Sequence, residues 1–410
     1  MKNIQIKGKA NAEDTDSISE SVYGLSSVTV LALGTFVVGT DAFIVSAFLP
    51  SMAEDLAVTP AMAGYSVTAF ALAYAVLGPI ISTLTSTLKR RQLLVSALVF
   101  LGLANIASAL APSFGVLMAT RVAAAAAAAA YTPNAGAAAA VMVRPEIRAR
   151  ALAVVIGGLT AATALGIPLG YVVSASLNWR AALMLVGVLS IVAAINVLAV
   201  MSKLPGSARL TLGQRLAVLR NRDVQVILPL TVMGMAACYV PYAFTIPVLD
   251  ALIGSSKSIT AMLTLYGSGA IAGNYLSGWA TDRTGPIPVL FSAYALMFGT
   301  LGAMALASGG FHSPHIFAAT LMICWGASSW AQTPAQQHRL ISSAPEEASL
   351  VAALNSSAIY LGISIGTAIG SHAIQVSVTQ TLWYGCALAG VALFYVLTTT
   401  SIHRSASRDG

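Results

Sequence analysis

The sequence predicts an all-α membrane protein with twelve transmembrane helices arranged as two six-helix halves, and three observations support this prediction. Hydrophobic residues make up 57% of the 410-residue chain and charged residues only 9%, against about 25% charged in an ordinary soluble domain. The apolar residues fall into blocks of about 20 residues or more, the length that crosses a bilayer core of about 30 Å. The two halves of the chain also repeat one another.

The apolar blocks are expected to be helices, because a chain in lipid must satisfy its own backbone hydrogen bonds and the blocks lack the alternation of barrel strands. The expected spans are 25–50, 61–83, 92–111, 115–142, 150–175, 180–202, 224–250, 259–281, 287–308, 313–337, 348–374 and 378–402. The first block is too long for the core of a signal peptide, so we expect it to be retained as a span.

These spans divide the chain into five regions. They are a disordered cytoplasmic tail (1–24), an N-terminal half (25–202), an amphipathic cytoplasmic linker (203–223), a C-terminal half (224–402) and a short cytoplasmic tail (403–410). If the first tail is inside, the cytoplasmic segments hold 18 of the 21 Lys and Arg residues. The positive-inside rule therefore predicts cytoplasmic termini in a bacterial-type inner membrane. The charges are scattered over loops, so nucleic acid is not expected as a partner.

A shift of 200 positions aligns glycines of the two halves with one another. The aligned pairs are Gly78 with Gly278, Gly166 with Gly366, and Gly170 with Gly370. The first pair closes the second span of each half, and the other two lie in the fifth. Two parallel six-helix repeats of this kind are typical of transporters that bind substrate near the membrane midplane, between the halves.

The segment GWATDRTG at 278–285 resembles the G-x-x-x-D-R-x-G loop signature of the major facilitator superfamily. The resemblance implies a major facilitator fold with a cytoplasmic gate, in which glycine allows close helix contact and the charged pair links the seam between the halves. The gating residues it assigns here are Gly278, Asp282, Arg283 and Gly285. The copy in the first half keeps Gly78, Arg90 and Arg91, but Ser82 stands where the signature has aspartate.

Two further motifs resemble the same superfamily. The run ALGIPLG resembles the fifth-helix motif of its antiporters and exporters, here as Gly166, Pro168 and Gly170, and it implies export. The segment 119–136 resembles the fourth-helix motif that carries a buried arginine, here Arg121. The branch that the chain resembles is that of sugar-efflux (arabinose-efflux-like) and drug:proton antiporters. This second resemblance rests on the segments 40–50, 148–170, 178–183 and 330–340.

Asp41 is the one acidic residue well inside a predicted span, and Arg121 is the one basic residue placed similarly. Their depths from the outer helix ends differ by roughly 3 Å at 1.5 Å per residue, so the two side chains can pair. A carboxylate inside the membrane is a functional hypothesis by default. We expect Asp41 to take up a proton from outside, in competition with substrate or with Arg121. The alternative is a permanent bridge that only locks two helices together.

Polar and aromatic residues in the spans that face the expected cavity are candidate substrate contacts. They are Asn134, Gln332, Asn355, Tyr74, Tyr131, Tyr239, Tyr242, Asn274, Trp330 and Tyr360. Each has an alternative reading, because Tyr and Trp often anchor helices at the membrane interface and Asn and Gln often join helices by hydrogen bonds.

The chain has no nucleotide-binding loop, no zinc-ligand spacing and no nucleophile elbow, and its three cysteines are not spaced as a pair. We therefore expect a non-enzymatic monomer without cofactor or metal, whose partners are a small-molecule substrate, protons and lipid. The expected function is proton-coupled export of a neutral or weakly charged sugar, nucleoside or drug. An importer or uniporter of the same fold, or a transport-inactive sensor, is the alternative.

Overall fold

The computed structural model describes residues 25–144, 147–201, 204, 206, 211–254, 258–309 and 313–406. Every regular element in this part of the chain is helical. Ten helical segments of it are long and apolar enough to cross a membrane. Two further helices, α12 (Ile259–Thr284) and α14 (His315–Ser343), are long enough at 26 and 29 residues but contain more polar side chains. The chain is thus a multi-pass membrane protein, and the predicted twelve-helix fold is confirmed.

Helices α1 to α8 form the N-terminal half. They are α1 (Leu25–Phe43), η2 (Ile44–Ala47), α2 (Leu49–Asp55), α3 (Pro60–Leu84), α4 (Arg90–Ala109), α5 (Phe114–Met142), α6 (Arg148–Ala161), η4 (Ala162–Gly166), α7 (Ile167–Ser176) and α8 (Trp179–Val200). The first and fifth spans are each broken into shorter pieces. Both breaks lie close to Asp41, as described below.

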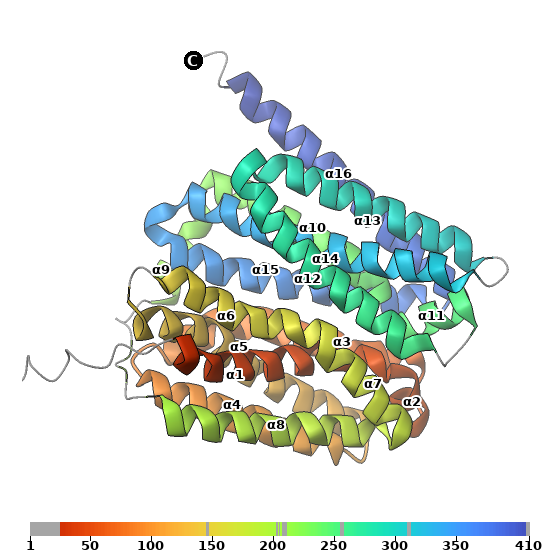
Figure 1. Ribbon diagram of the computed structural model, residues 1–410, viewed down its shortest axis with the longest axis horizontal. Coiled ribbons are helices and arrows are strands. Elements are labelled where there is room, and N and C mark those ends of the chain that lie inside the picture. The colour runs from red at the N-terminus through yellow and green to blue at the C-terminus, as the bar shows by residue number, and fades with distance from the viewer. Residues whose placement is uncertain are drawn as a thin grey trace, which may run out of the picture.

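Helices α10 to α16 form the C-terminal half, which lies beside the first (Figure 1). They are α10 (Arg222–Tyr242), α11 (Thr245–Ile253), α12, α13 (Pro286–Ser308), α14, η7 (Pro345–Glu347), α15 (Ala348–Ala373) and α16 (Val378–Ala406). Between the halves the chain forms α9 (Leu212–Ala217) and η5 (Val218–Arg220).

The predicted tails are only partly within the described residues, since 1–24 and 407–410 lie outside them. The last helix continues to Ala406, four residues beyond the predicted end of the span, so the start of the expected tail is helical. The sequence has no proline or glycine there before Gly410, so nothing in it breaks the helix where the apolar block ends.

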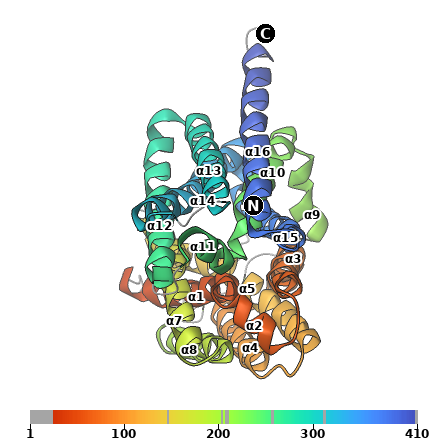
Figure 2. The same ribbon diagram turned by 90° about the vertical axis from the view of Figure 1, so that its right-hand side faces the viewer.

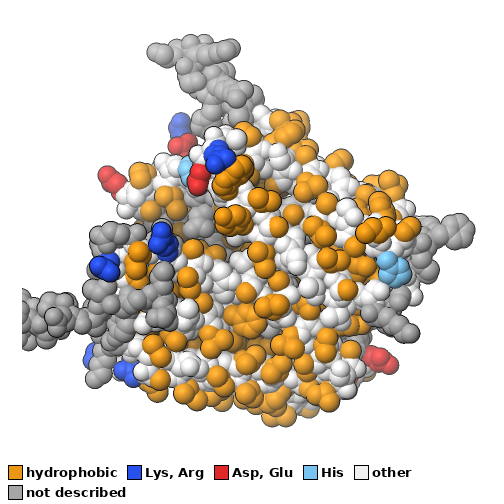
Figure 3. All heavy atoms as spheres, viewed as in Figure 1, with side chains coloured by type: hydrophobic (Ala, Val, Ile, Leu, Met, Phe, Trp, Pro, Cys, Tyr) orange, Lys and Arg blue, Asp and Glu red, His pale blue; other side chains and the backbone are white. Residues whose placement is uncertain are grey.

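The two halves pack corresponding helices together. The pairs α1–α6, α4–α8 and α3–α5 of the first half correspond to α10–α15, α13–α16 and α12–α14 of the second. Side chains of the hydrophobic class cover the middle of the molecule, and several Lys and Arg side chains gather at one end (Figure 3). Both features fit a bundle that crosses a bilayer with its basic loops on one side.

The aligned glycines of the fifth spans serve the same purpose in both halves. In each half, a Cβ atom at either glycine would collide with the first span of that half. The colliding residues are Thr40 and Ile44 for Gly166 and Gly170, and Ala236 and Val240 for Gly366 and Gly370. Small residues of this kind let two helices approach closely in lipid, where packing drives association.

Replacing Gly366 with leucine is expected to push α15 away from α10, because a Cβ atom there would lie 2.9 Å from the Cα atom of Ala236. The backbone cannot move aside as a flexible side chain can. We therefore expect the substitution to lower the free energy of unfolding by about 1–3 kcal/mol or more. The readout is the thermal unfolding temperature of the purified protein. Gly299→Leu is the matched control, since nothing lies within 4 Å of that position. Equal losses in both variants would contradict the prediction.

The fifth span contains a π-helical turn, η4, just before Pro168, and it closes with a bond from the Ile167 N–H to the Ala162 carbonyl. Proline lacks an N–H and cannot continue the regular helical pattern, which explains the irregular turn preceding it. The turn faces the other half: a Cβ atom at Gly267 of α12 would lie 2.8 Å from the Ala164 nitrogen. The irregular segment therefore lies in the seam between the halves.

The seam has two contact lines, α3 against α15 and α12 against η4 and α7. Figure 2 shows both pairs in the end-on view. The outer part is tightly packed, since a Cβ atom at Gly64 of α3 would lie 2.8 Å from the Phe244 ring. The two halves are therefore in close contact at this point of the seam.

Candidate functional site

Asp41 and Arg121 form a buried ion pair, with side chains that are 0% and 1% exposed. One guanidinium nitrogen donates to Asp41 Oδ1 at 2.5 Å, and the other donates to the Asp41 backbone carbonyl at 3.0 Å. The guanidinium also lies 4.5 Å from the centre of the Phe70 ring. The second carboxylate oxygen, Oδ2, is buried and has no hydrogen-bond partner among the described residues. This oxygen is where a proton or a polar ligand group can bind.

The local chain explains how the pair is positioned. Asp41 lies in the last turn of α1, which ends at Phe43 and continues as the tighter turn η2. The Thr40 hydroxyl donates to the Phe36 carbonyl, so it stays inside its own helix, where Gly166 leaves it room. Arg121 lies in the second turn of α5, and the alanines that follow it let α5 pack closely in the bundle.

Six aromatic rings lie across the seam beside this pair and form what we call the aromatic cluster. They are Phe43 from α1 and Tyr239, Tyr242, Tyr266, Trp325 and Trp330 from the C-terminal half. The Phe43 ring centre lies 6.2, 6.3 and 5.9 Å from those of Tyr239, Tyr242 and Trp330. The cluster joins the two halves just beyond Asp41 in the chain.

The aromatic cluster includes three predicted substrate contacts, Tyr239, Tyr242 and Trp330. The indole N–H of Trp325 is buried without an acceptor among the described residues. Aromatic faces bind apolar and flat groups, and a free N–H adds one directional contact. The cluster is therefore suited to an amphipathic molecule with few charges.

Tyr74 and Tyr360, also predicted contacts, stack on each other across the seam between α3 and α15. Their ring centres are 3.6 Å apart and the planes differ by 21°. Tyr360 is 6.4 Å from Phe70, the ring on which Arg121 rests. The ion pair of the N-terminal half is thereby connected to α15 of the C-terminal half through rings in contact.

Three of the amide side chains that we predicted to contact substrate form hydrogen bonds within their own halves in this structure. The Gln332 amide oxygen accepts from the Tyr294 hydroxyl at 3.0 Å, and the Asn355 amide oxygen accepts from the Thr231 hydroxyl at 3.1 Å. Asn134 accepts from Arg90. These bonds match the interhelical alternative, and a substrate role for the three amides stays a prediction.

Two further predicted substrate contacts, Tyr131 and Asn274, lie outside the aromatic cluster. The Tyr131 hydroxyl donates to the Leu31 carbonyl at 3.1 Å, so this buried tyrosine joins α5 to α1. Asn274 lies on α12, half-buried, between the exposed side chains of Tyr275 and Ile271 on one face and Gly273 on another. Neither residue is part of the aromatic cluster.

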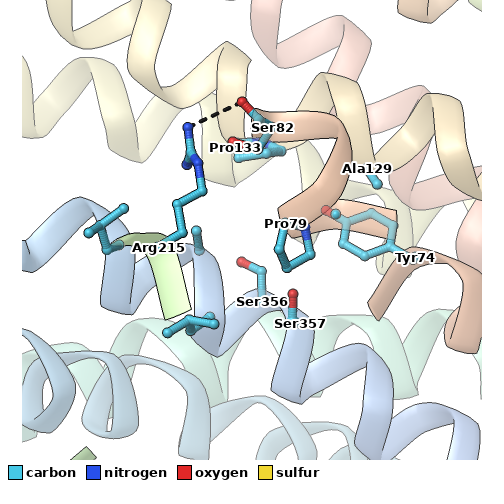
Figure 4. A pocket seen from close by; sticks show the side chains of 12 residues that line it. Tyr74, Pro79, Ser82, Ala129, Pro133, Arg215, Ser356 and Ser357 are labelled. Carbon is cyan, nitrogen blue, oxygen red and sulfur yellow. Dashed lines mark hydrogen bonds between the residues drawn. The ribbon is translucent and has the colours of Figure 1, made fainter. Parts of the chain in front are cut away.

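A narrow inner pocket, of about 30 Å³, lies between α3, α5, α9 and α15 (Figure 4). Tyr74, Pro79 and Ser357 line it, and Arg215 of α9 reaches over its mouth to donate to the Ser82 carbonyl at 3.2 Å. Its volume holds only a few water molecules. Partial burial lowers the pKa of the Arg215 guanidinium from its ordinary value. Arg215 thus fastens the linker to the N-terminal half at the position where the loop signature lacks its aspartate.

Replacing Arg215 with glutamine is expected to loosen this mouth, because the charged hydrogen bond to the last turn of α3 is lost. A cysteine introduced at Ser357, which lines the pocket, should then react several-fold faster with a maleimide added from the linker side. Arg220→Gln, an exposed arginine next to α9, serves as control and should leave the rate unchanged. An unchanged rate in the Arg215 variant would contradict this role.

The loop signature behaves differently from its predicted role. Asp282 and Arg283 are exposed and form no ion pair within the described part of the chain, so the expected link across the seam is absent; Arg283 lies 4.0 Å over the Trp279 ring instead. A Cβ atom at Gly278 would meet nothing within 4 Å among the described residues, so the expected close helix contact is not seen there. Gly285 has φ +81°, a conformation that favours glycine, and it ends α12.

The remaining predicted gating residues lie at helix ends and seams. Arg91 donates to the Leu198 carbonyl in the last turn of α8 at 2.5 Å, and the Arg90 N–H donates to the Leu204 carbonyl, just after α8, at 3.0 Å. Gly78 faces α15, with 3.7 Å between its Cβ position and the Ser357 hydroxyl. That is ordinary contact, not unusually close packing.

Sequence reasoning missed several residues of the site. Phe70, four residues before Tyr74 on α3, could have been found because such a pair shares one helix face. Phe43, Tyr266 and Trp325 join the aromatic cluster through contacts between distant helices, for which the sequence shows no signal. Arg215 was assigned only to the linker.

Comparison with known proteins supports the fold and the family. A sequence profile of the Major Facilitator Superfamily matches residues 31–367. The inner membrane transport protein YdhP of Escherichia coli (strain K12) is 30% identical over 369 residues, which covers 89% of this chain and 94% of YdhP. The chloramphenicol resistance protein of Streptomyces lividans is 29% identical over 391 residues, covering 92% and 98%. The MFS-type transporter YbcL of Bacillus subtilis (strain 168) is 27% identical over 360 residues, covering 87% and 91%.

Solved structures share the fold at low sequence identity. A bacterial homolog of the human lysosomal transporter Spinster, inward-facing and occupied, gives a TM-score of 0.72 at 15% identity and covers 92% of this chain and 96% of its own. The nucleoside transporter NupG gives 0.70 at 12% identity, covering 91% and 99%. With ten membrane-spanning helical segments among the described residues and the profile match over most of its length, the chain belongs to the major facilitator superfamily of membrane transporters and is not an enzyme.

Proposed function

We propose that the protein exports a small organic molecule in exchange for protons, by alternating access across an inner membrane. The observation that carries this proposal is the Asp41–Arg121 pair, buried beside the seam with one carboxylate oxygen unpaired. A buried carboxylate whose charge can be cancelled by a proton is the simplest device that links proton movement to a change in packing.

Proton uptake changes the forces on the pair in a definite way. Arg121 is held to Asp41 by a charge-assisted bond, which weakens when the carboxylate becomes neutral. The guanidinium is still held by the Asp41 backbone carbonyl and the Phe70 ring, so it stays in place while its charge becomes available to other groups. Phe70 touches Tyr360 of α15, which gives this local change a route to the seam.

Export is supported by two observations outside the pair. The chain is similar to a chloramphenicol resistance protein over 92% of its length. Its fifth span has the glycine-proline segment with the π-helical turn η4, positioned against α12 of the other half. Similarity to an inner membrane transport protein supports the same location here, with both termini on the cytoplasmic side that the basic loops indicate.

The aromatic cluster supports a neutral or weakly charged, amphipathic substrate, such as a sugar, nucleoside or drug. Its rings supply apolar contact, and Phe43 of the cluster lies two residues after Asp41, the carboxylate that pairs with Arg121. A strongly charged substrate would find few partners for its charges at that depth.

The test is substrate-evoked proton movement in proteoliposomes that contain an internal pH dye and the purified full-length protein. A panel of sugars, nucleosides and hydrophobic drugs is added with and without an imposed proton gradient. We expect at least one compound to move protons, and to accumulate against its own gradient when protons are supplied. Substrate flux that ignores the proton gradient would instead favour a uniporter of the same fold.

A further inference from the structure

A second pocket lies inside the C-terminal half, away from Asp41 and the seam. It is bordered by the ends of α10, α13, α14 and α16, is open to the surface on one side, and has a volume of about 380 Å³, within the range of small-molecule sites. Asp223 of α10 and Arg339 of α14 both line it. These helix ends are on the side of the linker and the basic loops, where the headgroups of the inner leaflet would lie.

The two opposite charges in this pocket do not neutralise each other directly. Asp223 and Arg339 form no ion pair within 4.0 Å; the pairs in the described part of the chain are those of Asp41 and Asp55. Both side chains line the same pocket, so one ligand can reach both of them. A ligand with one negative and one positive group would satisfy both charges without leaving either one unpaired.

Neither charge is fully used by the protein. Arg339 donates to the Gln336 amide oxygen at 3.1 Å, which is its one hydrogen bond to the described residues, whereas a guanidinium has five N–H donors. The Asp223 carboxylate accepts no hydrogen bond in the described residues. It is not needed to cap α10, because the Asn221 side chain already accepts from the Asp223 N–H at 2.9 Å.

The other residues that line the pocket suit a lipid headgroup and the start of its acyl chains. Ser342 and Thr399 supply hydroxyl groups, His338 lies at the exposed side, and Ile227 and Ile287 supply apolar surface. The end of α16 continues past the rest of the bundle (Figure 1).

We propose that this pocket binds the headgroup of a membrane phospholipid that carries both a phosphate and a primary ammonium group, as phosphatidylethanolamine does. Arg339 pairs with the phosphate, because a guanidinium binds phosphate oxygens at two points. Asp223 accepts hydrogen bonds from the ammonium. The site is independent of the proposed transport reaction, since it uses none of the residues of the ion pair or the aromatic cluster.

Native mass spectrometry of the full-length protein in detergent tests this proposal by titration with single lipids. We expect phosphatidylethanolamine to bind at least tenfold more tightly than phosphatidylglycerol, which lacks the ammonium, and than phosphatidylcholine, whose methylated nitrogen has no N–H. Arg339→Gln and Asp223→Asn should each weaken phosphatidylethanolamine binding about tenfold. Arg339→Lys keeps the charge but loses the two-point contact with phosphate, so its affinity should lie between those of the parent chain and Arg339→Gln.

Matched controls are Arg220→Gln and Glu346→Gln, which remove one exposed charge of each sign at the same end of the molecule. Both should bind phosphatidylethanolamine as the parent chain does, and all variants should elute as the same species with similar unfolding temperatures. Equal binding of phosphatidylglycerol, or full binding by Asp223→Asn, would overturn the two-charge site. Soluble glycerophosphoethanolamine should bind at least tenfold more weakly, and equal binding would overturn the assignment to a lipid.

Discussion

Asp41→Asn is expected to abolish substrate-evoked proton movement, with a loss of at least tenfold to the level of protein-free liposomes. Asparagine keeps the shape of the side chain and can still accept a hydrogen bond from Arg121. Its amide, however, does not take up a proton as a carboxylate does. The unpaired oxygen of the parent carboxylate is buried and has no hydrogen-bond partner among the described residues, so the substitution removes the proposed proton site itself. The measurement is the internal pH signal on addition of the substrate found in the panel.

Substrate exchange without net proton flux should persist in the Asp41 variant, since exchange requires only the binding site and the movement of the halves. Asp55→Asn is the matched control, because Asp55 also pairs with an arginine, Arg180, at 2.8 Å but at the exposed outer surface. It should keep proton coupling. An Asp41 variant that still moves protons would show that Asp41 is a structural partner of Arg121 and that coupling resides elsewhere.

The second large effect is expected on stability. Arg121→Gln should lower the free energy of unfolding by about 3–5 kcal/mol, because a buried carboxylate is left without the cation that compensates it. The double variant Asp41→Asn/Arg121→Gln should recover most of this loss, since a neutral pair has no uncompensated charge. Unfolding followed by SDS titration in mixed micelles measures the three variants and the parent as a double-mutant cycle.

The double variant separates the two interpretations of the pair. If the pair couples protons, the double variant is stable but moves no protons with substrate. If the pair is only a bridge between α1 and α5, stability and coupled transport return together. Additive losses in the cycle would contradict the contact itself, because two side chains joined at 2.5 Å must show an interaction energy.

Much of the architecture could be predicted because lipid imposes simple rules on a chain. Block length predicts spans, and the glycine pairs predict the repeat; Gly166 and Gly366 do make equivalent contacts in the two halves. Asp41 and Arg121 were found because charge inside an apolar block is conspicuous. The loop signature was less informative: Asp282 and Arg283 form no ion pair with the described residues of the other half, and a pairing between distant helices has no signal in the local sequence.

What the sequence by itself determined is therefore the membrane location, the twelve helices and the two buried charges, because each depends on the local balance of apolar and charged residues against lipid. Only the tertiary structure decided which rings meet in the aromatic cluster, that Gln332 and Asn355 bond within their own half, and that Arg215 covers the inner pocket. Those features depend on the rotation and tilt of helices distant in the chain. These are set by packing between side chains, for which hydrophobic length and charge contain no information.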